Sequence, residues 1–438
     1  MNRVHVIGAG LAGLSAAVAA TSAGRPVTLY EATAAGGGRC RSYFDTELGM
    51  RVDNGNHMLL SGNKSALAYV DTIGARDRLT GPSKPAFPFL DLKTGRQWTL
   101  RPNLGRVPWW LLFTGRRVPK TTTSEYLALR TLGREWDDTA ITETMTHNSF
   151  YWLLIEPLSI AALNTRPHEG LACLFGAVLR ETLMKGGKAC LPLLPKEGLS
   201  EALIDPAVAW LEQRGATILF NRRITGLRIQ DKTINALGTA DGPITLEPGD
   251  DVILAVPPWV VEELVPGVTV PNGFESILNV HFKFDARPRG DMAEANFVGL
   301  VNGTAEWLFF RPGLISVTVS AANKLIDRTA VDLASHIWPN IADALDLDGE
   351  WAVDVPPFRV IKERRATIAA NSAQEERRPG ARTSLENLRL AGDWTDTGLP
   401  GTIEGAIRSG VTAVDTILNA PAPEKRKRGW KRRASGDA

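Results

Sequence analysis

A glycine-rich turn near the N-terminus is the first feature of the sequence that could carry chemistry. Its residues, Gly8-Ala9-Gly10-Leu11-Ala12-Gly13, have the spacing GxGxxG. In this pattern the first glycine permits a tight turn, the second lets a pyrophosphate approach the backbone, and the third lets a helix pack closely on a strand. The free N–H groups and the partial positive charge at the start of that helix would then hold the phosphate oxygens.

The elements around this turn must place it correctly for such a role. Residues 4–7 (VHVI) predict a strand, residues 11–23 predict a helix, and residues 27–30 predict a second strand that ends at Glu31. A carboxylate at that point can accept hydrogen bonds from the hydroxyls of an adenosine ribose, whereas an arginine would have indicated a 2′-phosphate. The context predicts a dinucleotide site; the alternative is a glycine-rich turn without a ligand.

The fingerprint alone is compatible with NAD or FAD. It occurs once, at the N-terminus, and no second copy follows for a nicotinamide cofactor. We therefore predict FAD as the cofactor, with electrons passing between the flavin and a substrate or a separate donor.

Two further motifs resemble the flavin-containing amine oxidase and phytoene desaturase superfamily. One is Gly37-Gly38-Arg39 shortly after Glu31, and the other is the C-terminal run AGDWTDTGLPGTIEGAIRSG at 391–410. The resemblance implies that a helix beginning near the second motif directs its N-terminus at the pyrimidine side of the flavin, which would stabilise an anionic reduced ring. It implies that Glu31 holds the ribose, that Arg39 lies near the phosphates, and that Gly392 and Asp393 contact the ribityl-phosphate region. The full set of FAD-binding residues that it implies beyond the glycine turn is Glu31, Gly38, Arg39, His57, Met58, Ile224, Gly392, Asp393, Thr402 and Ile403.

Five longer stretches resemble one subgroup, the hydroxysqualene dehydroxylases of bacterial hopanoid biosynthesis. They are GGRCRSYFD (37–45), VDNGNHMLLSGN (52–63), EPLSIAALNTRP (156–167), ILNVHFKFD (277–285) and AGDWTDTGLPGTIEGAIRSG (391–410). This resemblance implies reductive loss of an allylic hydroxyl from hydroxysqualene, a C30 isoprenoid, to give squalene. It also implies an external electron donor for the flavin and neighbouring enzymes of the squalene pathway as partners.

Other functions remain open at this point. An isoprenoid desaturase or an amine oxidase would use the same flavin site with electrons flowing in the opposite direction. A non-catalytic isoprenoid-binding escort protein would have the same fold but would have lost its cofactor groups.

Loss of an allylic hydroxyl requires an acid, and four residues are candidates for the catalytic site. His57 follows the loop Asp53-Asn54-Gly55-Asn56 and could donate a proton, or only hydrogen-bond the flavin or a carbonyl. Asn279 and His281 share one face of a predicted strand, where a structural role is the alternative. Glu156 precedes a proline in an apolar stretch and is either a buried acid or a solvated carboxylate at a helix end.

The length of 438 residues exceeds what one hydrophobic core supports, which is roughly 250–300 residues. We expect an α/β protein with a discontinuous Rossmann-type FAD domain (1–75, 195–265 and 386–420) and an interleaved α+β substrate domain (76–194 and 266–385). Strands are predicted at 277–284 and 314–320, and a helix from Ile403 to Leu418. Residues 82–120, rich in aromatics and prolines, have an irregular pattern.

Composition and charge constrain the surroundings of the protein. Three cysteines at wide spacing, Cys40, Cys173 and Cys190, argue against a disulfide framework and a metal site, so we expect no metal and a reducing cytoplasm. No segment has the features of a signal peptide or reaches the ~18 apolar residues of a spanning helix.

Two segments nevertheless indicate contact with a membrane surface. Pro108-Trp109-Trp110-Leu111-Leu112-Phe113 lies between Arg106 and the cations Arg116, Arg117 and Lys120, a composition typical of the membrane interface. The basic segment 421–438 would add attraction to anionic lipid, or is a solvated, disordered tail. We expect a cytoplasmic protein attached peripherally to the inner face of the cell membrane, with no nucleic-acid partner.

Overall fold

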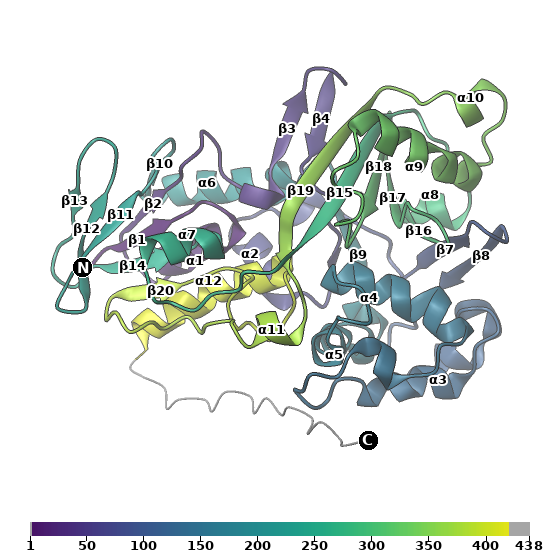
Figure 1. Ribbon diagram of the computed structural model, residues 1–438, viewed down its shortest axis with the longest axis horizontal. Coiled ribbons are helices and arrows are strands. Elements are labelled where there is room, and N and C mark those ends of the chain that lie inside the picture. Colours follow the sequence, from purple (N-terminus) through teal and green to yellow (C-terminus); the bar gives the residue numbers. More distant parts are fainter. Residues whose placement is uncertain (1, 420–438) are drawn as a thin grey trace.

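The strand that precedes the glycine turn lies in the middle of a five-stranded parallel sheet. The computed structural model describes residues 2–419, and Figure 1 shows this sheet at the end of the molecule that holds the N-terminus. Its order is β10-β2-β1-β14-β20. The strands are β1 (Val4–Ile7), β2 (Val27–Tyr30), β10 (Thr217–Leu219), β14 (Asp251–Leu254) and β20 (Leu388–Leu390). The predicted discontinuous α/β fold is thereby confirmed, while the domain limits remain a prediction and the predicted tail at 421–438 lies outside the described residues.

Two helices from opposite ends of the chain pack together beside this sheet (Figure 1). They are α1 (Leu11–Ser22) and α12 (Ile403–Leu418), and the second has the predicted bounds. The contact is close because a Cβ on Gly410 would lie 2.3 Å from the carbonyl oxygen of Ala12. Ser15 Oγ also donates to the carbonyl of Ile407 at 2.8 Å. The glycine at the end of the C-terminal motif is therefore explained by helix packing.

Smaller elements complete this part of the fold. A separate antiparallel sheet consists of β11 (Gly226–Gln230), β12 (Thr233–Gly238) and β13 (Ile244–Thr245), and its apolar residues share a core cluster with the parallel sheet. A hairpin is formed by β3 (Ser42–Asp45) and β4 (Met50–Asp53). A small three-stranded sheet has β9 (Pro192–Pro195) between β5 (Leu59–Leu60) and β6 (Leu79–Thr80). The helices are α2 (Lys64–Thr72), α6 (Asp205–Glu212), α7 (Pro258–Leu264) and α11 (Ser372–Glu375).

A second, seven-stranded sheet contains the strands predicted at 277–284 and 314–320. Its order is β19-β15-β18-β17-β16-β7-β8. The strands are β7 (Phe87–Asp91), β8 (Arg96–Leu100), β15 (Phe274–Lys283), β16 (Phe297–Val301), β17 (Trp307–Arg311), β18 (Leu314–Val319) and β19 (Phe358–Ile368). The hairpin β7–β8 differs from the irregular pattern expected at 82–120. Pro88 argued against a strand in the sequence. The strand tolerates this proline because β7 begins to pair with β16 only at Phe89.

The two faces of this sheet have different characters. Val280, Phe282 and Val317 point into a core shared with α9 (Ala330–Leu345) and α8 (Asp291–Ala295). The short helix α10 (Glu350–Val353) follows α9 and has no buried residue. Because side chains alternate along a strand, their neighbours point to the opposite face. That face carries the polar residues Asn279 and Thr318, which are cross-strand partners. From Thr318 the row of cross-strand partners continues over the neighbouring strands with Trp307, Gly299, Phe89 and Trp98.

A helical region covers this mixed polar and aromatic face. It contains α3 (Thr123–Ala128), α4 (Glu156–Leu163) and α5 (Ala172–Glu181), and Figure 1 shows it far from the parallel sheet. A π-helical turn, Tyr151–Ile155, leads directly into α4. Phe89, Trp98 and Trp307 share one apolar cluster with these helices. The sheet face and the helices thus form one substructure next to the parallel sheet.

Candidate functional site

The glycine turn has the geometry that a pyrophosphate requires. Gly8 has φ of +104°, and a Cβ there would lie 2.6 Å from the carbonyl oxygen of Ala255. A Cβ on Gly13 would lie 1.8 Å from the carbonyl oxygen of Gly8, so helix and strand pack through this position. A Cβ on Gly10 would meet no atom within 4 Å. The middle glycine therefore borders open space at the start of α1, where a phosphate can approach the backbone.

Glu31 lies beside this turn at the end of β2. Its Oε2 accepts a hydrogen bond from the N–H of Ala9 at 2.8 Å, and its Oε1 accepts from the N–H and Oγ1 of Thr33 at 2.9 and 2.8 Å. The N–H of Arg222 donates to the carbonyl of Glu31 at 2.7 Å. This contact brings the segment that contains Ile224 next to Glu31, as expected for residues around an adenosine.

Arg39 joins the N-terminal and C-terminal motifs. Its Nη2 lies 2.6 Å from Oδ1 of the buried Asp393, and its Nη1 donates to the carbonyl of Ala366. The preceding segment runs along the glycine turn, since the N–H of Gly37 donates to the carbonyl of Ala9 at 2.7 Å. Gly38, with φ of +55°, faces Gly10. Residues at opposite ends of the chain thus converge beside the open space at Gly10.

In the run Gly392-Asp393-Trp394, the two residues that flank Asp393 are held by packing and hydrogen bonds. A side chain on Gly392 would meet the indole of Trp394, because a Cβ would lie 2.2 Å from Nε1. The N–H of Gly392 donates to Ser409 Oγ at 2.8 Å, and Trp394 Nε1 donates to the carbonyl of Val256 at 3.1 Å. These contacts fix the carboxylate of Asp393 at the end of β20.

Arg378 is a site residue that sequence reasoning missed. Its side chain is fully buried, and it donates to the carbonyls of Asp393, Thr395 and Leu399 and pairs with Glu375 at 3.0 Å. One guanidinium therefore holds the whole loop that connects β20 to α12. No motif marks it, because Arg378 stands in an ordinary charged stretch, EERRPGAR.

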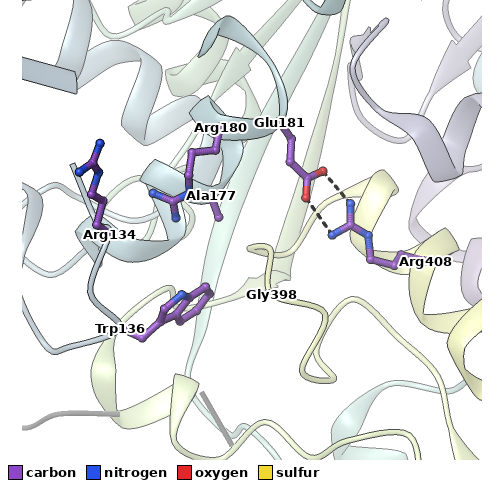
Figure 2. A pocket seen from close by; sticks show the side chains of 7 residues that line it. All are labelled: Arg134, Trp136, Ala177, Arg180, Glu181, Gly398 and Arg408. Atoms are coloured by element: carbon purple, nitrogen blue, oxygen red, sulfur yellow. Dashed lines mark hydrogen bonds and ion pairs between the residues drawn. The ribbon is translucent and has the colours of Figure 1, made fainter. Parts of the chain in front are cut away.

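The N-terminus of α12 is formed as expected, and it is braced by charged side chains. Thr402 Oγ1 accepts from the N–H of Gly405 at 3.1 Å, which places Thr402 at the N-cap and Ile403 in the first turn. Glu404 accepts from the N–H groups of Ser65 and Ala66 at the start of α2, at 3.0 and 2.8 Å. Arg408 pairs with Glu404 and, from α12 to α5, with Glu181 at 2.6 Å. This last pair lines a pocket of about 270 Å³, and Figure 2 shows the two side chains pointing toward each other.

Asn279 is buried and holds the loop that carries His57. Its Oδ1 accepts from Thr318 Oγ1 at 2.9 Å and from Asn56 Nδ2 at 3.4 Å, and its Nδ2 donates to the carbonyl of Asn54 at 3.4 Å. All polar atoms of the amide are therefore engaged by protein. This favours a positioning role for Asn279, in place of the predicted contact with a substrate hydroxyl.

His281 is also structural. One ring nitrogen lies 2.7 Å from Ser316 Oγ and the other 2.8 Å from the carbonyl oxygen of Asp53, and the residue has no exposed surface. Burial lowers its pKa to about 4, so the ring is neutral at neutral pH. Both nitrogens tie β15 to β18 and to the end of β4, which favours the structural alternative for His281 over a contact with the substrate hydroxyl.

His57 and Met58 lie on the loop after β4 and are half-buried, together with Asn56. Burial is the main cause that lowers the pKa of His57 to about 4, and Arg39 contributes in the same direction. A neutral imidazole can donate a hydrogen bond but is a poor source of a proton at neutral pH. Asp53 does not bond this ring: its carboxylate accepts from Ser42 Oγ at 2.6 Å and from the N–H of Leu199 at 2.9 Å.

Glu156 begins α4 directly after the π-helical turn and is half-buried. Burial raises its pKa, while Arg166 and His147 oppose the shift. A second carboxylate, Glu306, was not identified from the sequence. Burial is the first cause that raises the pKa of Glu306 to about 7, and Glu156 acts in the same direction. The only sequence signal for Glu306 is a single acid before the apolar strand WLFF.

No group of three or more histidine, cysteine, aspartate or glutamate side chains within residues 2–419 is placed to hold a metal ion. No helix in the described part of the chain is long and apolar enough to span a membrane.

The chain is similar to known proteins in sequence and in fold. Residues 11–418 match the family described as flavin containing amine oxidoreductase. The hydroxysqualene dehydroxylase of Zymomonas mobilis is 44% identical over 420 residues, covering 96% of this chain and 100% of the relative. That of Sinorhizobium fredii is 43% identical, covering 95% of this chain and 98% of the relative. Among solved structures, cyclohexylamine oxidase from Brevibacterium oxydans superposes with a TM-score of 0.67 at 16% identity, covering 95% of this chain and 98% of that one, a likeness of fold alone.

Proposed function

The chain belongs to the hydroxysqualene dehydroxylase family of flavin-containing amine oxidoreductases, and from this premise we propose that it removes the allylic hydroxyl of hydroxysqualene reductively to give squalene. It is a flavin-dependent oxidoreductase. The observation that carries the proposal is the identity of 43–44% with dehydroxylases along 95–96% of the chain and nearly their whole length. The open space at Gly10 and the position of Glu31 beside it support the proposal.

We propose FAD as the flavin. The open space at Gly10, the start of α1 and the carboxylate of Glu31 suit the pyrophosphate and the adenosine ribose. Asp393, positioned by Arg39, suits the ribityl region, and the N-terminus of α12 suits the pyrimidine side of the ring. When bound and reduced, the flavin supplies a hydride.

The remaining chemistry belongs to the chain's own residues. They must hold a long apolar substrate, keep water out and deliver a proton to the leaving oxygen. The aromatic row on the seven-stranded sheet supports the first two tasks: Phe89 stacks on Trp98 and meets Trp307 edge-on, each at 5.6 Å. Gly299 makes this row possible, because a Cβ there would lie 2.7 Å from the ring of Phe89.

The alternative functions make different predictions. A desaturase or oxidase would need an electron acceptor and would add a double bond or oxidise an amine. An escort protein would not need the contacts at Gly10, Glu31, Arg39 and Asp393. To separate these functions, purified protein reduced with dithionite is incubated with hydroxysqualene and the product is identified by mass spectrometry. Squalene supports the proposal, and unchanged substrate contradicts it.

We propose, as a further part of this function, that the protein takes its substrate from a membrane surface. Four side chains of one short segment are exposed although they are large and apolar: Val107 (74%), Trp109 (47%), Leu112 (71%) and Phe113 (54%). We refer to them as the apolar wedge. Trp110 and Leu111 of the same 3₁₀ turn are buried at 4% and 3%, so the wedge is anchored in the core of the helical region.

Cations accompany the wedge. Arg116 lies over the ring of Trp109 with Cζ at 4.9 Å from the centroid, and Arg106 and Lys120 are exposed. Aromatic and aliphatic side chains beside arginine and lysine suit the headgroup region of an anionic bilayer. In a flotation assay with vesicles of anionic phospholipid, we expect the wild type to float and a W109S/L112S/F113S variant to stay in solution. The matched control V331S/W351S, which changes exposed apolar residues elsewhere, should float; equal flotation of all three proteins would contradict the proposal.

A further inference from the structure

Glu306 is a carboxylate in the interior of the substrate region. It lies in the connection between β16 and β17, between Ala305 and Trp307, which are 0% and 7% exposed. Its backbone N–H donates to the carbonyl of Thr318 at 3.2 Å. Its Oε2 accepts a hydrogen bond from the N–H of Ser320 at 2.7 Å. The side chain is therefore fixed in place while part of its surface stays accessible.

A short series of contacts connects Glu306 with the loop that carries His57. Thr318, its backbone partner, donates to Asn279 and accepts from Asn56 Nδ2 at 3.1 Å. Asn56 immediately precedes His57, which we expect to face the flavin. The backbone of Glu306 is thus linked, through Thr318, to the loop expected at the redox centre.

Helix α4 supplies the neighbours on the opposite side. Asn164, at the end of α4, accepts from the N–H of Ala321 at 2.7 Å, and this bond fixes the helix against Ser320. The charged groups that act on Glu306 are Glu156 and Arg166. Glu156 and Arg166 therefore act electrostatically on Glu306 across the boundary between helices and sheet.

We propose that Glu306 is the acid that protonates the leaving hydroxyl of the isoprenoid. This inference rests on the proposed function. The proton moves from the Glu306 carboxyl to the hydroxyl oxygen, the carbon–oxygen bond breaks, and water leaves. A bound, reduced flavin would supply the hydride that the allylic carbon takes up, and would thereby be oxidised by two electrons. The glutamate regains its proton from solvent.

The other candidates are less suited to this role. His281 has both nitrogens bonded, and His57 is neutral at neutral pH. Burial, together with Glu156, keeps the pKa of Glu306 near 7, although Arg166 and the Ser320 N–H oppose the shift. A carboxylic acid that keeps its proton near neutral pH can donate it in the reaction.

Three isosteric variants test the inference: E306Q, E156Q and, as a control, E275Q. Glu275 is also half-buried and near Arg166, but it accepts from Asn323 Nδ2 at 2.7 Å, away from the proposed acid. The rate of flavin reoxidation by hydroxysqualene is followed in single turnover, without oxygen, as a function of pH. We expect the wild-type rate to fall as pH rises through about 7, because Glu306 then loses its proton. The rate of E306Q should be at least about 100-fold lower and should no longer depend on pH in this range. In E156Q the decrease in rate should occur at lower pH, and E275Q should resemble wild type.

A second measurement does not depend on activity. Infrared difference spectra of the flavin-loaded protein between acid and alkaline pH should contain a carboxylic C=O band that titrates near pH 7 and is missing in E306Q. If wild type and E306Q share the same rates and the same band, the inference is overturned while the proposed function stands. If wild type itself leaves hydroxysqualene unchanged, the proposed function fails and this inference fails with it.

Discussion

Replacement of Arg378 by lysine should loosen the flavin site without unfolding the protein. The buried guanidinium donates to three carbonyls of the loop 393–399 and pairs with Glu375. Lysine keeps the charge but offers one nitrogen, so it cannot reach carbonyls that lie in different directions. Each buried carbonyl left without a donor costs about 1–3 kcal/mol, and we expect the free energies of folding and flavin binding to lose about 2–4 kcal/mol together.

Most of this loss should appear in cofactor binding, because the loop carries Asp393 and leads into α12. If about 2 kcal/mol is lost from binding, the Kd for the flavin rises about 30-fold. Titration of apoprotein with FAD, followed by flavin fluorescence, measures this Kd, and thermal unfolding measures the stability.

The neighbouring Arg377 provides a matched control. It is half-buried and its Nε donates to the carbonyl of Val270 at 2.8 Å, outside the loop. R377K should bind the flavin as wild type does. An R378K variant with the wild-type Kd and stability would refute the assignment of Arg378 as the residue that holds the loop.

Three further predictions follow from the geometry. G10V should fold but fail to retain flavin, because its Cβ would have no protein atom within 4 Å and would lie in the open space at the turn. The flavin absorbance of the purified protein checks this. G13A should lose about 1–3 kcal/mol of unfolding free energy, since its Cβ would lie 1.8 Å from the Gly8 oxygen; denaturant unfolding with a wild-type result would contradict it. The pKa of His281 falls from 6.5 to about 4 on folding, so its neutral form stabilises the protein above pH 6.5 and this stability is lost as pH decreases toward 4. Unfolding free energy should decrease by up to about 3 kcal/mol over this range, and H281Q should flatten the slope.

The dinucleotide half of the site was predictable because its chemistry is local. The turn, the helix and Glu31 lie within one βαβ unit, and each glycine has a steric reason that is visible in the spacing. The C-terminal motif could be placed only through resemblance. Its physical reasons, such as the bond from Gly392 to Ser409 and the approach of Gly410 to α1, appear only in the folded chain.

The substrate side was less accessible to sequence reasoning. The shared strand face of Asn279 and His281 was predicted correctly, but the pattern did not reveal that Thr318, Ser316 and the loop after β4 already occupy their polar atoms. Glu306 was missed because no neighbouring residue in the sequence indicates its environment. Its environment is made by helix α4, which lies about 150 residues away in the sequence, so nothing next to it marks it.

The most direct test of the proposed function is the electron balance of the reaction. Purified protein is reduced stoichiometrically without oxygen and mixed with hydroxysqualene, and the flavin spectrum and the product are followed together. We predict that one flavin is reoxidised for each squalene formed. Flavin that stays reduced while the substrate is unchanged would contradict reductive dehydroxylation.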